Sequence, residues 1–255
     1  MRVQRLRIDP EVLLIHDFVT PSEAESLISE AEALFKRSPT VCDDPDGCVT
    51  NQRTSSSAAL PVSATTNVVQ ARGRSFSGLP VAEAIQVVRY EPGQRFEPHL
   101  DAFGMSSGDA RALAQYEGRQ RVATILIYLG GPDDGGQTTF PELGLRVDPI
   151  PRAALYWRNV KPDGSIDSRT LHGGDPVRLG TKYAANLWLR GDQDPVYAYA
   201  VSENVDAPAA PPSSGKTAAI LALGVGVGAA IAGPPGAILG GVLGWTVDAV
   251  RRKIR

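Results

Sequence analysis

The chain has 255 residues, and its 26 lysine and arginine residues against 28 aspartate and glutamate residues give a formal net charge of −2. A charge this close to balance produces no field that would attract nucleic acid, so we expect no nucleic-acid partner. The length fits either one large β-rich domain or one domain with an appendage. The change of composition after residue 206 favours the second.

The amino-terminal segment carries no long apolar run. Its apolar stretch at residues 12–15 is only four residues long. This is too short for the hydrophobic part of a secretory signal. We therefore predict that the protein is cytoplasmic.

Two helices are predicted ahead of most of the strands. Thr20-Pro21-Ser22-Glu23 has the pattern of a capping box with proline at the first helical position, and apolar residues then recur at helical spacing as far as Phe35. We expect this helix to pack against a sheet. A weaker helical pattern covers residues 64–72.

From residue 84 onward the pattern changes to short β-rich runs separated by proline and glycine clusters. Helices followed by strands indicate the α+β class, and many short strands suit a sandwich or jelly roll. The predicted strands are 85–90, 95–101, 122–129, 153–157, 169–172 and 182–190.

The two cysteines, Cys42 and Cys48, lie close together in a polar loop. A disulfide across this short loop is one interpretation, and a pair of free thiols is the other. A reducing compartment favours free thiols. We assign neither cysteine a role.

The carboxy-terminal region differs from the rest of the chain. We predict a domain over residues 1–206, a Pro/Ser-rich linker over 207–216, and a Gly-rich hydrophobic tail over 217–255. Residues 217–247 are almost uncharged and carry glycines four apart, which permit close helix contact in lipid. Pro234-Pro235 divides this stretch into arms too short for a straight span.

Positive charge precedes and follows the apolar tail, at Lys216 and at the basic end of the chain. This distribution favours a re-entrant hairpin attached to the cytoplasmic face of a membrane. The alternatives are a single broken span, a Gly-rich helical pair that folds onto the domain, or self-association through 217–247.

The most informative feature is the pair His99 and Asp101. Positions two apart on a strand project to the same side, so both side chains can reach one metal ion. The remaining histidines are His16 and His172, and His172 is the candidate third ligand. Two imidazoles and one carboxylate suit non-haem Fe(II). The alternative is that a His-x-Asp triplet arises by chance.

Several ordered motifs accompany this pair. Their order and gaps resemble the prolyl 4-hydroxylase branch of the Fe(II)/2-oxoglutarate dioxygenases over residues 17–190. The motifs are Arg53-Thr54-Ser55, the segment from Tyr90 to Asp101, the segment from Arg121 to Leu129, Gly135-Gly136-Gln137-Thr138-Thr139-Phe140-Pro141, the segment 151–159, and the segment from His172 to Lys182.

The resemblance implies a double-stranded β-helix, or jelly roll, with the early helices on its larger sheet. It implies Fe(II), 2-oxoglutarate as cosubstrate, O2, and ascorbate as a reductant. It also implies a reaction in which 2-oxoglutarate is decarboxylated to succinate while a prolyl residue in a peptide or protein is hydroxylated.

The resemblance further assigns residues to the cosubstrate and the substrate. Lys182 is expected to pair with the distal carboxylate of 2-oxoglutarate, and Tyr90 and Thr138 to hydrogen-bond it. Arg121 and Arg53 are expected to contact the substrate. The alternatives are an exposed edge-strand lysine, a buried tyrosine bonded to a backbone carbonyl, and arginines at the surface or at strand ends.

Strand alternation after Thr181 predicts that four side chains share one face of the strand: Lys182, Ala184, Asn186 and Trp188.

Two further hypotheses stay open for the whole chain. One keeps the chemistry but takes free proline, another amino acid or a small metabolite. The other is a catalytically silent iron or 2-oxoglutarate binding module whose tail serves a membrane or assembly function.

Overall fold

The computed structural model describes residues 1–42, 44, 48–191 and 205–206. The predicted linker at 207–216 and the tail at 217–255, with its hypothesis of membrane contact or self-association, lie outside these residues. Within the part of the chain that is described, no helix is both long and apolar enough to cross a bilayer. Most of the described elements are strands, with few helices.

The larger sheet contains ten of the described strands, in the order β16-β1-β2-β12-β8-β15-β6-β4-β3, with β5 paired to β15. The long strands β8 and β15 lie side by side at its centre. The strands are β1 (Arg2–Arg7), β2 (Val12–His16), β3 (Lys36–Arg37), β4 (Ser56–Ala59), β5 (Val81–Ala82), β6 (Gln86–Tyr90), β8 (Gln120–Gly130), β12 (Ala154–Arg158), β15 (Lys182–Gly191) and β16 (Val205–Asp206).

A smaller sheet has the order β11-β10-β13-β7, and β9 and β14 form a separate pair. The two sheets fit the predicted jelly roll. Two 3-10 turns, η1 (Pro141–Leu143) and η2 (Ser168–Thr170), lie between strands. The strands are β7 (Phe96–His99), β9 (Asp134–Gly135), β10 (Thr138–Phe140), β11 (Leu145–Val147), β13 (His172–Gly174) and β14 (Val177–Leu179).

The first predicted helix is present as α1 (Pro21–Glu32), and its capping box is formed. Thr20 and Glu23 each accept a hydrogen bond from the other's backbone N–H, at 3.2 and 2.9 Å. This satisfies two amides that a helix start would otherwise leave unpaired. The second helix, α2 (Ala64–Ser77), extends beyond the predicted stretch and ends at Gly78 in the left-handed conformation.

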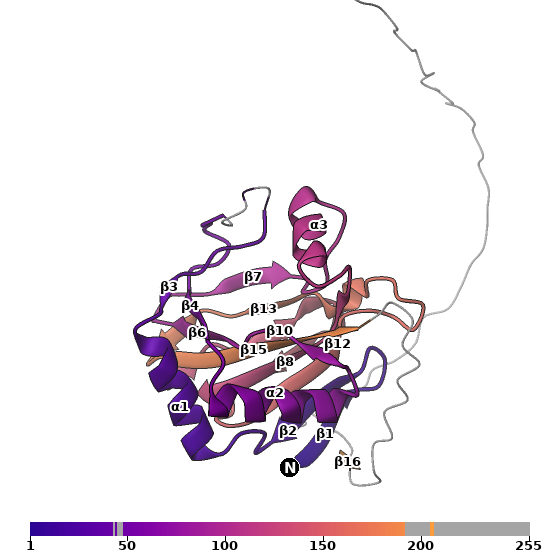
Figure 1. The fold of residues 1–255 in the computed structure, drawn as a ribbon. Coiled ribbons are helices and arrows are strands. Elements are labelled where there is room, and N and C mark those ends of the chain that lie inside the picture. The colour runs from indigo at the N-terminus through magenta and orange to yellow at the C-terminus, as the bar shows by residue number, and fades with distance from the viewer. Residues whose placement is uncertain (43, 45–47, 192–204, 207–255) are drawn as a thin grey trace, which may run out of the picture. The chain divides into compact units, whose positions relative to one another are not determined.

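Both helices pack against the larger sheet, as predicted: α1 contacts β8 and α2 contacts β15. Figure 1 shows the two helices on one side of that sheet. A Cβ atom on Gly73 of α2 would lie 2.5 Å from Leu187 Cδ2, so glycine permits this close approach. The core between helices and sheet includes Leu27, Val69, Phe76, Ile125 and Leu187.

Several features of the fold were not predicted from the sequence, including short strands such as β4 and β10. Strands β1 and β2 precede α1, so the order of helices first and strands later is wrong at the amino terminus. Residues 12–15 form a strand between β1 and β12, and their side chains are buried on the two faces of the sheet. Helix α3 (Ser107–Ala114) was also missed.

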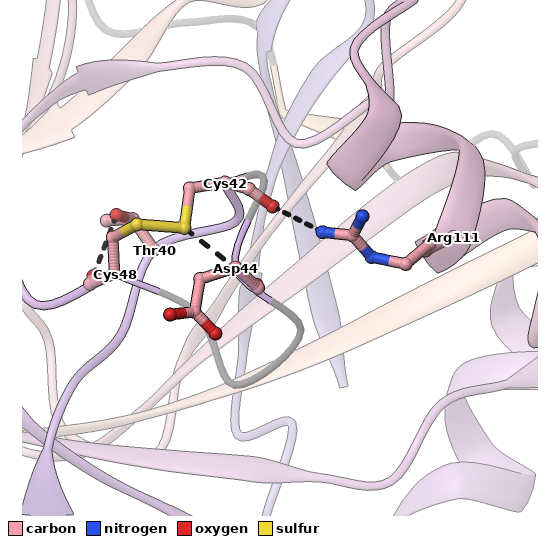
Figure 2. The surroundings of a disulfide bond; sticks show 5 residues. All are labelled: Thr40, Cys42, Asp44, Cys48 and Arg111. Carbon is pink, nitrogen blue, oxygen red and sulfur yellow. Dashed lines mark hydrogen bonds between the residues drawn. A yellow bond between two sulfur atoms is a disulfide. The ribbon is translucent and has the colours of Figure 1, made fainter.

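The strand predicted at 169–172 begins only at His172. The residues before it form the 3-10 turn η2, because the Asp167 side chain accepts a hydrogen bond from the Arg169 amide and caps the turn. The expectation of two free thiols is also wrong. Cys42 and Cys48 form a disulfide, which Figure 2 shows beside Thr40 and Arg111.

Candidate metal centre and cosubstrate pocket

A cavity of about 650 Å³ lies between the two sheets. Its lining comes from strands of both sheets, from the loop before β4 and from α3. All of the site residues predicted from the sequence line this one cavity. They are Arg53, Tyr90, His99, Asp101, Arg121, Thr138, His172 and Lys182.

The three predicted iron ligands lie together. One candidate ligand atom from each of His99, Asp101 and His172 can be chosen so that all three lie within 4.8 Å of one another. His172 pairs directly with His99 across β13 and β7, which puts both imidazoles on one strand pair. The Nε2 atoms of His99 and His172 lie 3.8 and 3.6 Å from the carboxylate oxygens of Asp101.

Both imidazoles are oriented by backbone carbonyls. The Nδ1 atom of His99 lies 2.9 Å from the Glu97 carbonyl oxygen, and Nδ1 of His172 lies 2.9 Å from that of Thr170. A carbonyl oxygen only accepts, so each Nδ1 carries the hydrogen and each Nε2 presents its lone pair to the site. Such contacts orient histidines for metal binding.

The electrostatics of the cluster also suit a cation. Burial, together with the neighbouring His172, lowers the pKa of His99 to about 3, so this imidazole is neutral at ordinary pH. Burial alone would raise the pKa of Asp101, but the adjacent His172 and His99 lower it below its usual value. Neutral imidazoles and an ionised carboxylate are the protonation states that metal binding requires.

The Asp101 carboxylate is held from behind by a chain of two hydrogen bonds. The Thr124 hydroxyl donates to Asp101 Oδ2 at 2.7 Å, and Asn159 Nδ2 donates to Thr124 Oγ1 at 2.9 Å. Thr124 and Asn159 are both buried. The donor set and its support therefore fit Fe(II), which binds two imidazoles and one carboxylate.

Lys182 is a buried cation in the wall of the cavity, with 3% of its surface exposed. Its Nζ donates to the Gly136 carbonyl oxygen at 2.8 Å and lies 5.3 Å from the Tyr90 ring centre. Burial lowers its pKa to about 8, although the charge of Asp175 acts in the opposite direction. A carboxylate bound beside Lys182 would offset the cost of burying this charge, so the site fits a dicarboxylate such as 2-oxoglutarate.

Tyr90 and Thr138 lie near this lysine. Tyr90 pairs with Lys182 across β6 and β15, and burial raises its pKa. Thr138 accepts a hydrogen bond of 2.8 Å from the hydroxyl of Tyr128, a residue that was not predicted. The Tyr128 ring centre lies 5.5 Å from Lys182 Nζ, so the buried Tyr128 supports Thr138 and Lys182 from behind the cavity wall.

The predicted face of β15 is confirmed, because Lys182, Ala184, Asn186 and Trp188 all line the cavity. Arg121 lies farther along the same wall. Its guanidinium group packs 3.6 Å from the Trp188 ring centre and donates two hydrogen bonds, of 2.6 and 2.8 Å, to Glu83. Arg190 donates a further bond of 2.6 Å to Glu83.

Arg53 is buried rather than a surface residue. It donates to Gln86 Oε1 at 2.8 Å and to the Pro39 carbonyl at 3.2 Å, and it packs over the Phe96 ring. Phe96 in turn stacks on His99, with 3.6 Å between ring centres. Arg53 thus connects the loop before β4 to the wall beside the metal centre.

Sequence reasoning missed the residues that support the site from behind. Thr124 stands as a polar residue in an otherwise apolar run, and Asn159 follows an apolar strand directly. A buried polar side chain needs a partner, so these positions carried a signal. The role of Glu83 carried none, because its partners lie 38 and 107 residues away in the chain.

Comparison with known proteins agrees with this geometry. The family model of the 2OG-Fe(II) oxygenase superfamily matches residues 85–190. Prolyl 4-hydroxylase 5 of Arabidopsis thaliana is 34% identical over 212 residues, which cover 73% of this chain and 70% of that protein. Human prolyl 4-hydroxylase subunit alpha-3 is 35% identical over 195 residues, but the match covers only 35% of that subunit.

Among solved structures, the viral collagen prolyl hydroxylase of Paramecium Bursaria Chlorella virus-1, in its 2OG complex, aligns with a TM-score of 0.57 and 25% identity. The alignment covers 71% of this chain and 96% of the viral chain. With two histidines, one aspartate and a buried lysine around one cavity, the chain belongs to the prolyl 4-hydroxylase family of 2OG-Fe(II) oxygenases and is a 2-oxoglutarate-dependent dioxygenase.

Proposed function

We propose that this dioxygenase hydroxylates prolyl residues in a peptide or protein. The observation that carries the proposal is the convergence of His99, Asp101 and His172 in the cavity that also contains Lys182. The names of the relatives support proline as the residue that is oxidised.

In this proposal His99, Asp101 and His172 hold Fe(II), and Lys182 pairs with the distal carboxylate of 2-oxoglutarate. Bound iron, 2-oxoglutarate and O2 would together supply two changes: 2-oxoglutarate is decarboxylated to succinate and CO2, and a substrate C–H bond becomes C–OH. Tyr90 and Thr138 lie beside Lys182 and would orient the cosubstrate by hydrogen bonds.

Arg53 and Arg121 would position the substrate. Both side chains line the cavity, Arg53 as a buried residue and Arg121 as a partly buried one. Each donates a hydrogen bond to a residue on a distant segment, Arg53 to Gln86 and Arg121 to Glu83. A fixed donor beside an apolar wall suits the carbonyl groups of a peptide backbone, which are strong acceptors. Trp188 and Phe96 supply the apolar surface that would pack against a proline ring.

A turnover experiment with two substrates tests this proposal. Purified protein with Fe(II), 2-oxoglutarate and O2 should form succinate with a peptide of alternating alanine and proline, and the peptide should gain the mass of one oxygen atom. Free proline serves as the competing substrate. Hydroxylation of free proline but not of the peptide would replace the proposed substrate class with a small metabolite.

His172→Ala and His16→Ala are matched variants for this experiment. His172 lines the cavity, whereas His16 lies on β2 of the larger sheet. Succinate formation should be lost in the first variant and kept in the second. If wild-type protein forms no succinate under any condition, the silent binding module becomes the better hypothesis.

A further inference from the structure

The rim of the cavity is built by two segments that are far apart in the sequence. The loop before β4 contributes Val41 and Cys42, and helix α3 contributes Gly108 and Arg111. These residues line the same cavity as His99. Figure 1 shows this loop and α3 on the same side of the domain, beyond β7.

The two rim segments meet at the backbone carbonyl of Cys42. Arg111 Nη2 donates a hydrogen bond of 2.9 Å to the Cys42 carbonyl oxygen, as Figure 2 shows. A Cβ atom on Gly108 would lie 2.3 Å from that same oxygen. Because this distance is far below normal contact, only glycine allows α3 to approach Cys42 so closely. The carbonyl of Cys42 is therefore the point at which the loop meets α3.

The other end of the loop is fixed independently of α3. Thr40 and Cys48 exchange two backbone hydrogen bonds, of 2.8 and 2.9 Å, and the Thr40 hydroxyl donates a third to Cys48. Arg53 donates to the neighbouring Pro39 carbonyl. The Cys42–Cys48 disulfide therefore links the anchored pair Thr40 and Cys48 covalently to Cys42, whose carbonyl contacts α3.

We propose that the Cys42–Cys48 disulfide is a redox-dependent positioning element for the peptide substrate. In the oxidised protein the disulfide holds Cys42 against α3, so the rim residues keep one fixed position around the bound peptide. When reduced, it releases this contact, and the peptide binds more weakly. The inference rests on the proposed peptide substrate.

The reducing step is balanced by a dithiol. The dithiol supplies two electrons and two protons, the S–S bond breaks, Cys42 and Cys48 become thiols, and the reductant forms its own disulfide. The closed loop is short, because the two cysteines are six positions apart in the sequence. Short loops gain least stability from a disulfide, so the main effect of reduction should be local rather than global unfolding.

The test compares oxidised and dithiol-reduced full-length protein with the alternating alanine–proline peptide. Reduction should raise the KM for the peptide by about fivefold, the factor expected for one lost hydrogen bond of ordinary net strength. The KM for 2-oxoglutarate should stay as it is in the oxidised protein. Equal peptide KM values in the two states would overturn the proposal.

Two variants separate the redox effect from other effects of the reductant. A Cys42→Ser, Cys48→Ser double variant should show the raised peptide KM at once and should not respond to the dithiol. Gly108→Ala should raise the peptide KM while the disulfide is intact, because the added methyl group pushes α3 away from Cys42. A double variant that still responds to the dithiol would contradict the assignment.

A measurement without turnover keeps this inference separate from the proposed function. Amide hydrogen exchange in α3, which contains no cysteine, should speed up when the disulfide is reduced. Unchanged exchange in α3 would overturn the positioning role whatever the substrate is. Faster exchange without any peptide hydroxylation would support the rim coupling and reject the peptide as substrate.

Discussion

The Thr124 hydroxyl donates a hydrogen bond of 2.7 Å to Oδ2 of Asp101, the carboxylate proposed to bind iron. Neighbours of this kind fix the orientation of a metal ligand, and their loss lowers metal affinity by about tenfold or more. Thr124→Val should therefore weaken Mn(II) binding by about tenfold, as measured by calorimetry. Thr124→Ser keeps the hydroxyl and should bind as wild type does. If the valine and serine variants bound Mn(II) with equal affinity, the Thr124 hydroxyl would have no role in metal binding.

Removal of His172 should abolish metal binding with little effect on the fold. Strand β13 is held by backbone hydrogen bonds to β10 and β7, which His172→Ala keeps. We expect affinity for Mn(II) to fall by more than about a hundredfold, because a direct ligand counts for more than its supporting neighbours. Calorimetry gives the affinity and circular dichroism gives the fold. Tight metal binding by a folded variant would exclude His172 as a ligand.

Replacement of Lys182 should act on the cosubstrate. Lys182→Met keeps an apolar stem of similar length and removes the charge that would pair with the distal carboxylate. The KM for 2-oxoglutarate should rise by about tenfold to a hundredfold, since hydrogen bonds to charged groups contribute ~1.5–3 kcal/mol. The exposed Lys36, changed to Met, provides the matched control. If only the KM for the peptide changed, Lys182 would be assigned to binding the peptide substrate instead of 2-oxoglutarate.

The pH dependence of cosubstrate binding should follow the same lysine. Burial lowers the pKa of Lys182 to about 8, so the ammonium is charged below that pH and loses its proton above it. A dicarboxylate prefers the charged form, and the KM for 2-oxoglutarate should therefore rise as pH increases through about 8, approaching about tenfold per pH unit. Steady-state kinetics across this range measure it. Lys182→Met should lack the rise, and if it persists there another group is responsible.

Glu83 should matter for stability, since one of its carboxylate oxygens accepts bonds of 2.6 Å from both Arg121 and Arg190. The Arg190 side chain is 1% exposed, so loss of the carboxylate leaves a buried charge without its acid. Glu83→Gln should lower the free energy of unfolding by about 3 kcal/mol, measured with urea. Glu91→Gln breaks the half-exposed pair with Arg89 and should lower it by less than about 1 kcal/mol. Similar losses in both variants would show that burial of the cluster is unimportant.

The sequence predicted the parts of the site that depend on local spacing. His99 and Asp101 are two residues apart, and Lys182 begins a strand whose alternation follows from the sequence, so their placement could be derived before any coordinates. The capping box of α1 is local in the same way. The resemblance to a family supplied the rest of the ligand set.

What the sequence did not yield depends on contacts between distant segments. The buried carboxylate of Glu83 meets its arginines only once β8 and β15 are paired. The disulfide was missed because the pattern was interpreted from the expected redox compartment rather than from the Thr40–Cys48 bridge, which draws the cysteines together. The cytoplasmic location, the domain boundaries and the membrane contact of residues 217–247 stay predictions.

The pairing of His172 opposite His99 ties the chemistry of this enzyme to strand register. A slip of one position would turn the later imidazole to the far side of its sheet, although no side chain had been altered. A register slip of β13 against β7 would thus silence the enzyme as completely as replacement of a ligand. The backbone pairing of β13 with β7 is therefore as much a part of the metal site as the ligands are.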